Sequence, residues 1–121
     1  MATPPLPLEA EEFLAWMLSE KGRSANTLAA YRRDLRSYHA WLDAEGATML
    51  DVSHDALVRF IGERKASDAA TSTVARQVAA IRMLHRYLAI EGHRRDDPTA
   101  NLEGVKVPSG IPKPLTETQV T

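Results

Sequence analysis

The sequence predicts an all-α fold, a compact bundle of four main helices plus a short fifth helix. Apolar residues recur at spacings of three and four along four long stretches, and no stretch alternates as a half-buried strand would. Glycines and capping residues stand between these stretches, where helices would end and begin. With 121 residues, 44% of them hydrophobic, the chain suits one domain with its own core.

The first two helices are expected on the N-terminal side. The first runs from about Leu8 to Lys21, and Gly22 follows it as a stop. The second runs from about Ala25 to Glu45, with Ser24 as its N-cap and Gly46 just beyond its end. Its apolar stripe consists of Leu28, Tyr31, Leu35, Tyr38 and Leu42.

Two further long helices follow. The third spans roughly His54 to Lys65 after Ser53 as its N-cap. The fourth begins near Thr71 or Ser72 and ends near Gly92. The apolar stripe of the fourth helix consists of Val74, Val78, Ile81, Leu84 or His85, and Leu88.

The end of the chain differs in composition from the rest. A short fifth helix is expected after Asp97, which can cap it while Pro98 takes the first helical position. The stretch "VKVPSGIPKP" (105–114) is rich in proline and glycine and is typical of a linker. A capping-box pattern in "LTETQV" then indicates the start of another helix. We therefore expect a helical domain at 1–104, with 105–121 forming a linker and the start of a C-terminal domain that is not present.

The charges are distributed unevenly although their sum is only −1. Residues 21–36 carry five basic residues against one acid, and residues 72–95 repeat that ratio. The segments around them are acidic. Because docking depends on the shape of the field more than on net charge, the two basic segments could form a positive face if they lie together.

The outer faces of the second and fourth helices share one chemistry on a helical wheel. Arg33 lies almost opposite the apolar stripe of its helix, and Arg76 occupies the same place on the fourth helix. Small residues and hydroxyls precede the arginines on both faces, with Asn26, Ser72 and Thr73 near the helix N-termini. Such a surface suits phosphate contacts and close approach of a duplex. The alternative is an ordinary solvated helix face.

Candidate catalytic and metal-binding groups are few. The chain has no cysteine, which excludes disulfides and thiolate metal sites and favours a reducing compartment, the cytoplasm. The four histidines show no metal-ligand spacing, and no phosphate loop or nucleophile elbow occurs. The stretch "RRDDP" (94–98) is interpreted as a turn and helix cap. No cofactor, metal, membrane span or enzymatic activity of this fragment is predicted.

The chain resembles the N-terminal core-binding domain of tyrosine recombinases, the phage integrase family, and within it the bacterial Xer recombinases. The matching stretches are "FLAWMLSEKGRSANTLAAYRRDLRSYHAWLDAEG", "TSTVARQVAAIRMLHRYLAIEGHRRDDPTANL" and "GIPKPLTETQV". Thr27, Tyr31, Asp34 and Leu35 match a pattern of that family. The resemblance covers nearly all of residues 10–120.

The resemblance implies a SAM-like helical bundle that forms half of a C-shaped clamp on double-stranded DNA. The second and fourth helices would cross the major groove of a recombination half-site, and other protomers would join a tetramer. By position, it implies DNA contacts from Asn26, Thr27, Ala30, Arg32, Arg33, Ser72, Thr73, Arg76 and Gln77, with Arg82 and Arg86 as further candidates. Family members often carry a basic residue near position 72, where this chain has serine.

The family's catalytic residues lie in a C-terminal domain that this sequence does not contain. The parent protein is therefore expected to be a tyrosine recombinase, whereas this fragment would bind DNA without cleaving it. The alternative hypothesis is a helical protein–protein interaction module that binds no nucleic acid, because SAM-like bundles serve both roles.

Overall fold

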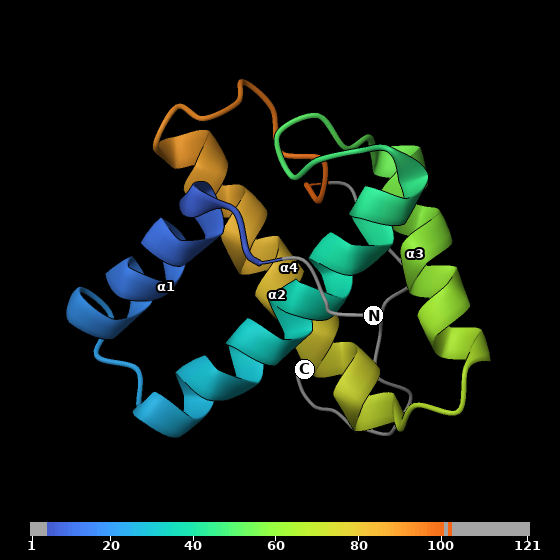
Figure 1. Ribbon diagram of the computed structural model, residues 1–121, viewed down its shortest axis with the longest axis horizontal. Coiled ribbons are helices and arrows are strands. Elements are labelled where there is room, and N and C mark those ends of the chain that lie inside the picture. Colours follow the sequence, from blue (N-terminus) through green and yellow to red (C-terminus); the bar gives the residue numbers. More distant parts are fainter. Residues whose placement is uncertain (1–4, 101, 103–121) are drawn as a thin grey trace, which may run out of the picture.

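The computed structural model describes residues 5–100 and residue 102, and this part contains helices, turns and loops but no strand. Its four helices are α1 (Leu8–Ser19), α2 (Ala25–Glu45), α3 (His54–Ala66) and α4 (Thr71–Ile90) (Figure 1). The predicted all-α fold with four main helices is confirmed, and every helix boundary lies within two residues of its expected position. The predicted linker at 105–114 and the helix expected after it lie outside the described residues.

Capping residues set both ends of α2 and the start of α3 as predicted. The Ser24 hydroxyl accepts a hydrogen bond from the backbone N–H of Thr27 at 3.1 Å, and Ser53 accepts one from Ala56 at the same distance. Gly46 ends α2 in the left-handed conformation with a φ of 75°. These caps satisfy backbone groups that the helices leave without an internal partner.

The short fifth helix expected after Asp97 is not formed by the described residues. Asp97 accepts hydrogen bonds from the backbone N–H and the hydroxyl of Thr99 at 2.9 and 2.6 Å. The N–H groups of Ala100 and Leu102 then bond to carbonyls only three residues back. This is a series of turns in place of helix geometry, so Asp97 caps a turn and the prediction of a helix here was wrong.

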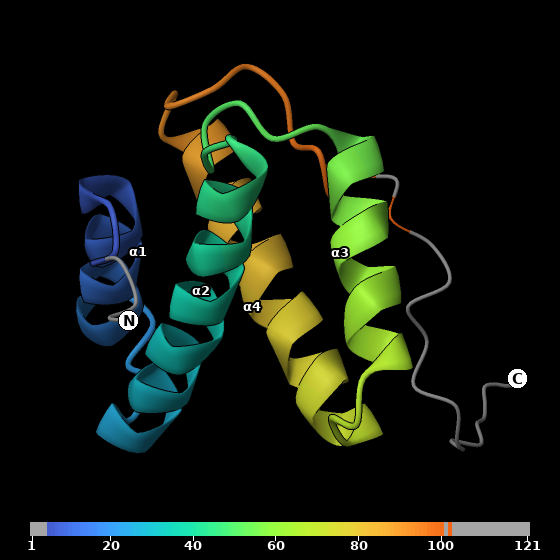
Figure 2. The same cartoon turned by 45° about the vertical axis from the view of Figure 1, so that its right-hand side comes forward.

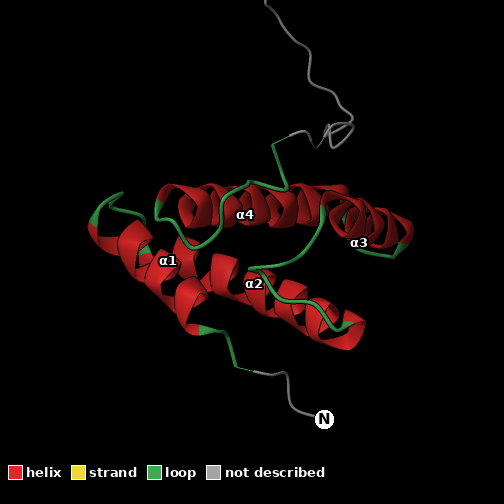
Figure 3. Ribbon diagram, turned by 90° about the horizontal axis from the view of Figure 1, so that it is seen from above, coloured by secondary structure: helices red, strands yellow, loops and turns green. Residues whose placement is uncertain are grey.

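The helices pack as two layers, with α1 and α2 in one and α3 and α4 in the other (Figure 3). Helix α4 is central, because it contacts α1, α2 and α3, and it crosses α2 in the middle of the bundle (Figure 1). The largest fully buried side chains belong to all four helices and to the α2–α3 loop. They are Tyr38, Phe13, Met17, Leu35, Leu42, Met49, Leu57, Ile81, Leu84, Leu88, His85 and Val52.

The core includes one polar pair. The Tyr38 hydroxyl lies 2.7 Å from Nε2 of His85, whose side chain is fully buried. Burial lowers the pKa of His85 to about 4, with a smaller contribution in the same direction from the Arg94 charge. His85 is therefore a neutral core residue that pairs with a hydroxyl on the facing helix.

Candidate nucleic-acid interface

The N-terminal ends of α2 and α4 lie at the same end of the bundle (Figures 1 and 2). Neither helix has an acidic residue in its first turn, whereas α1 and α3, which begin at the opposite end, both have one or more. The N-cap position of α4 is Ala70, which cannot provide a side-chain cap. Unpaired N–H groups and the helix dipole give such ends a positive potential. We call this end of the bundle, with residues 24–37 and 70–76, the α2/α4 end.

Basic side chains of the neighbouring segments add to the charge there. Arg23 is exposed in the α1–α2 loop, and α3 finishes at this end with Arg64 and Lys65 in its last turn. Two acids, Glu20 and Asp68, lie in the adjoining loops. The local balance is positive although the whole chain is slightly acidic.

The predicted outer face of α2 faces solvent. Asn26, Ala29, Arg33 and Arg36 are exposed and follow one another at spacings of three and four. Within the described part of the chain, the side chains of Arg33 and Arg36 have no ion-pair or hydrogen-bond partner. They are available to a polyanion, and Ala30 beside them is half-buried and small.

Two other predicted α2 contacts are already engaged. Nη1 of Arg32 lies 2.6 Å from Oε2 of Glu11, which ties α2 to α1 and compensates the arginine charge. The hydroxyl of Thr27 accepts a hydrogen bond from the Ser24 hydroxyl at 2.9 Å, within the helix cap. Both residues lie at the α2/α4 end, but Arg33 has the more accessible charge.

On α4 the predicted outer face needs correction. Arg76 is turned toward α2, where its guanidinium forms two hydrogen bonds with Asp34. Gln77 is buried and accepts a hydrogen bond from Nε of Arg64 at 3.0 Å, and Ala80 is 0% exposed. Because α4 packs against three helices, it buries side chains on more than one side. The side opposite its predicted apolar stripe is therefore not its solvent-exposed face.

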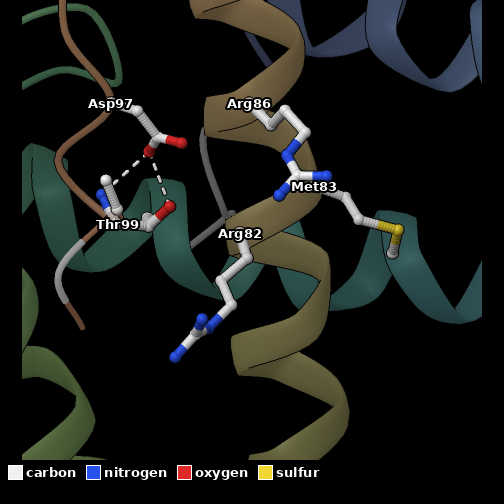
Figure 4. Close-up of a pocket in the computed structure, with 6 residues that line it drawn as sticks. Arg82, Met83, Arg86, Asp97 and Thr99 are labelled. Atoms are coloured by element: carbon white, nitrogen blue, oxygen red, sulfur yellow. Dashed lines mark hydrogen bonds between the residues drawn. The ribbon is translucent and has the colours of Figure 1, made fainter. Parts of the chain in front are cut away.

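Exposed side chains of α4 include Ser72, Ala79, Arg82 and Arg86, while Thr73 is half-buried. Arg82 donates from Nη2 to the carbonyl of Leu102 at 2.7 Å. With Arg86, Asp97 and Thr99 it borders a hollow of about 240 Å³ beside the segment that follows α4 (Figure 4). These two arginines therefore lie in the other layer from Arg33. The two basic segments also approach each other between α1 and α4, where Arg86 lines a hollow with Lys21 and Arg23.

The Asp34–Arg76 pair is the feature of this site that sequence reasoning missed. Asp34 is only 2% exposed, and its hydrogen bonds to the guanidinium raise the pKa of Arg76. A signal for the burial was present, because Asp34 lies three residues after Tyr31 and four before Tyr38, on the apolar stripe itself. A buried carboxylate needs a partner, and a basic residue on a facing helix is the simplest one.

Other kinds of site find little support in the described residues. No group of three or more histidine, aspartate or glutamate side chains there could hold a metal ion. None of the helices that the structure describes has the length and apolarity needed to cross a membrane.

Residues 10–92 match the family described as "Phage integrase, N-terminal SAM-like domain". The match covers more than half of the chain and all or part of every helix, so the chain belongs to this family of all-α domains. This confirms the resemblance described above.

The individual relatives are recombinases. The chain is 41% identical over 111 residues to "Tyrosine recombinase XerD" of Pasteurella multocida. This alignment covers 92% of this chain and 37% of that protein. It is 41% identical over 102 residues to the XerD of Haemophilus influenzae, covering 84% and 34% of the two chains. It is 37% identical over 113 residues to "Tyrosine recombinase XerC" of Herpetosiphon aurantiacus, covering 93% and 37%. The chain thus spans just over a third of the length of these relatives.

Proposed function

We propose that this chain is the DNA-binding domain of a site-specific tyrosine recombinase that grips a recombination half-site in the major groove. The observation that carries the proposal is that two helix N-termini without an acidic residue in the first turn, those of α2 and α4, lie at the same end of the bundle. Exposed Asn26, Arg33 and Ser72 lie there, which suits contacts to the phosphates on either side of a groove.

In this proposal the family membership supports the recombinase assignment, and the exposed residues of the α2/α4 end make the DNA contacts. Strand cleavage and rejoining belong to a C-terminal catalytic domain of the parent recombinase, and other protomers complete a tetramer on cytoplasmic DNA. Of the residues expected at the interface, Asn26, Arg33, Ser72 and Thr73 serve as direct contacts, and Ala30 permits close approach. Arg32 and Thr27 support the helix that carries them.

A second candidate function, a protein-interaction module, has one observation in its favour. A hollow of about 400 Å³ lies between α1 and α4, lined by Trp16, Met83, Tyr87 and Ile90 among others. Ile90 is 72% exposed. Exposed apolar surface of this kind can dock another protein. Lys21 and Arg23, which precede the N-cap of α2, also line this hollow, but Arg33 and Ser72 do not. Variants at Arg33 and Ser72 therefore separate the two functions.

The separating experiment is a fluorescence anisotropy titration of a labelled duplex carrying a Xer-type half-site at low salt. Ser72→Glu combined with Arg33→Glu should weaken binding about tenfold or more, because two carboxylates then face phosphates. Ser72→Glu should not harm folding, since a carboxylate in the first turn of α4 is favourable to the helix. Arg76 is left unchanged, because a glutamate there would oppose the buried Asp34 carboxylate.

The matched control is Arg95→Glu. Arg95 is exposed and follows α4 at the opposite end of the bundle, and its reversal changes the net charge as the Arg33→Glu change does. It should leave binding nearly unchanged once salt is moderate. Equal losses in the control and the double variant would contradict the proposed surface. Duplex binding that is absent even at low salt would favour the interaction module.

A further inference from the structure

The ion pair between α2 and α4 fixes one arginine in an unusual way. Nε of Arg76 lies 2.9 Å from Oδ2 of Asp34, and Nη2 lies 2.8 Å from Oδ1. The carboxylate therefore occupies the side edge of the guanidinium with both of its oxygens. Asp34 itself is 2% exposed and is held by the core around Leu35 and Tyr38, so the anchor of this pair is rigid.

The other edge of the same guanidinium is open. An arginine has five N–H donors, and the Asp34 carboxylate takes one from Nε and one from Nη2. The described residues provide no partner for Nη1, and the Arg76 side chain remains 40% exposed. The two parallel N–H groups of the end edge, one on Nη1 and one on Nη2, can therefore donate to an external acceptor pair.

The open edge lies at the α2/α4 end. Arg76 is one turn beyond Ser72 on α4, and Asp34 is one turn beyond Ala30 on α2, so both belong to the N-terminal halves of their helices. One turn earlier on the two helices stand Ser72, which is exposed, and Ala30, which is half-buried and small. The crossing of α2 and α4 in Figure 1 brings Asp34 and Arg76 together.

We propose that Asp34 is a positioning residue that holds Arg76 so that the end edge of its guanidinium reads one guanine in the major groove. Guanine presents O6 and N7 as paired acceptors there, and a bidentate arginine matches them. The pair with Asp34 removes most of the conformational freedom that an arginine loses when it binds a base. This inference rests on the proposed DNA-binding function and adds a base preference to it.

The test is selection from a library of short duplexes with a randomised half-site, followed by sequencing of the bound fraction. The unmodified chain should prefer guanine at one position. Arg76→Lys keeps the charge and removes the fork, and it should reduce that preference about 5- to 150-fold. Asp34→Asn should reduce the same preference and leave preferences at other positions intact. Arg33→Lys is the matched control and should keep the guanine preference.

The possible outcomes are distinct. If Arg76→Lys and Asp34→Asn both bind DNA with the base preferences of the unmodified chain, the ion pair is only structural and the inference is wrong. If the unmodified chain selects no duplex at all, the proposed function fails together with the inference. Helical content and thermal unfolding are measured for each variant. If Asp34→Asn does not fold, Asp34→Glu takes its place, because it keeps the charge but displaces the carboxylate and should also lower the guanine preference.

Discussion

Replacing Arg94 with methionine should lower the free energy of unfolding by about 3 kcal/mol. The Arg94 side chain is only 9% exposed, and it donates from Nη1 to the Met49 carbonyl and from Nη2 to the Val52 carbonyl, both at 3.0 Å. Its Nε also donates to Asp96 at 2.8 Å. The side chain thus joins the α2–α3 loop to the segment after α4, and its loss leaves two carbonyls of buried residues without partners.

The measurement is urea-induced unfolding followed by far-ultraviolet circular dichroism at neutral pH. Arg95→Met is the matched control, because Arg95 is adjacent and exposed, and its side chain has no partner among the described residues. The control should change the free energy of unfolding by less than about 0.5 kcal/mol. If the two variants unfold at the same urea concentration, Arg94 does not join the two loops as described.

Acid should destabilise the fold through His85. Burial lowers its pKa to about 4 in the folded chain, compared with 6.5 for an unperturbed histidine. The contribution of neutral His85 to the free energy of unfolding is therefore complete above pH 6.5 and falls as the pH drops. Between pH 6.5 and about 4 the unfolded chain binds a proton at this histidine, whereas the folded chain does not. The slope approaches about 1.4 kcal/mol per pH unit, and the total loss by pH 4 is roughly 3 kcal/mol.

The combined change His85→Leu and Tyr38→Phe tests this assignment. Both members of the polar pair are removed together, so neither is left buried without its partner. Thermal unfolding is measured from neutral pH down to about pH 4 for both proteins. The double variant should lose most of the pH dependence in this window. An unchanged dependence would show that His85 is not its source.

Most of the helical architecture follows from local sequence. Ser24 and Gly46 mark the ends of α2 because a side-chain cap and a left-handed residue act within a few positions of the helix. The spacing of Leu35 and Tyr38 similarly reveals which side of α2 is buried. These signals need no knowledge of the other helices, so they can be recognised in the sequence.

The interface was less predictable because it depends on long-range packing. Arg76 is 42 residues from Asp34 along the chain, and the local pattern that indicates the burial of Asp34 does not identify its partner. Arg76 was placed opposite the apolar stripe because a helical wheel assumes one buried stripe, whereas α4 contacts three helices. Arg94 was interpreted only as part of a turn. Its hydrogen bonds reach a loop more than 40 residues away, which the local sequence does not reveal. Tertiary contacts, which local patterns do not encode, decide all of these positions.

The central claim is that the α2/α4 end binds DNA, and the most direct measurement is a nitrogen–proton NMR titration of the labelled chain with a half-site duplex. The account predicts that the amide signals of residues 24–33 and 70–76 shift most and that added salt reverses the shifts. Shifts concentrated around Trp16, Tyr87 and Ile90, or around Arg95, with the α2/α4 end unaffected, would contradict it.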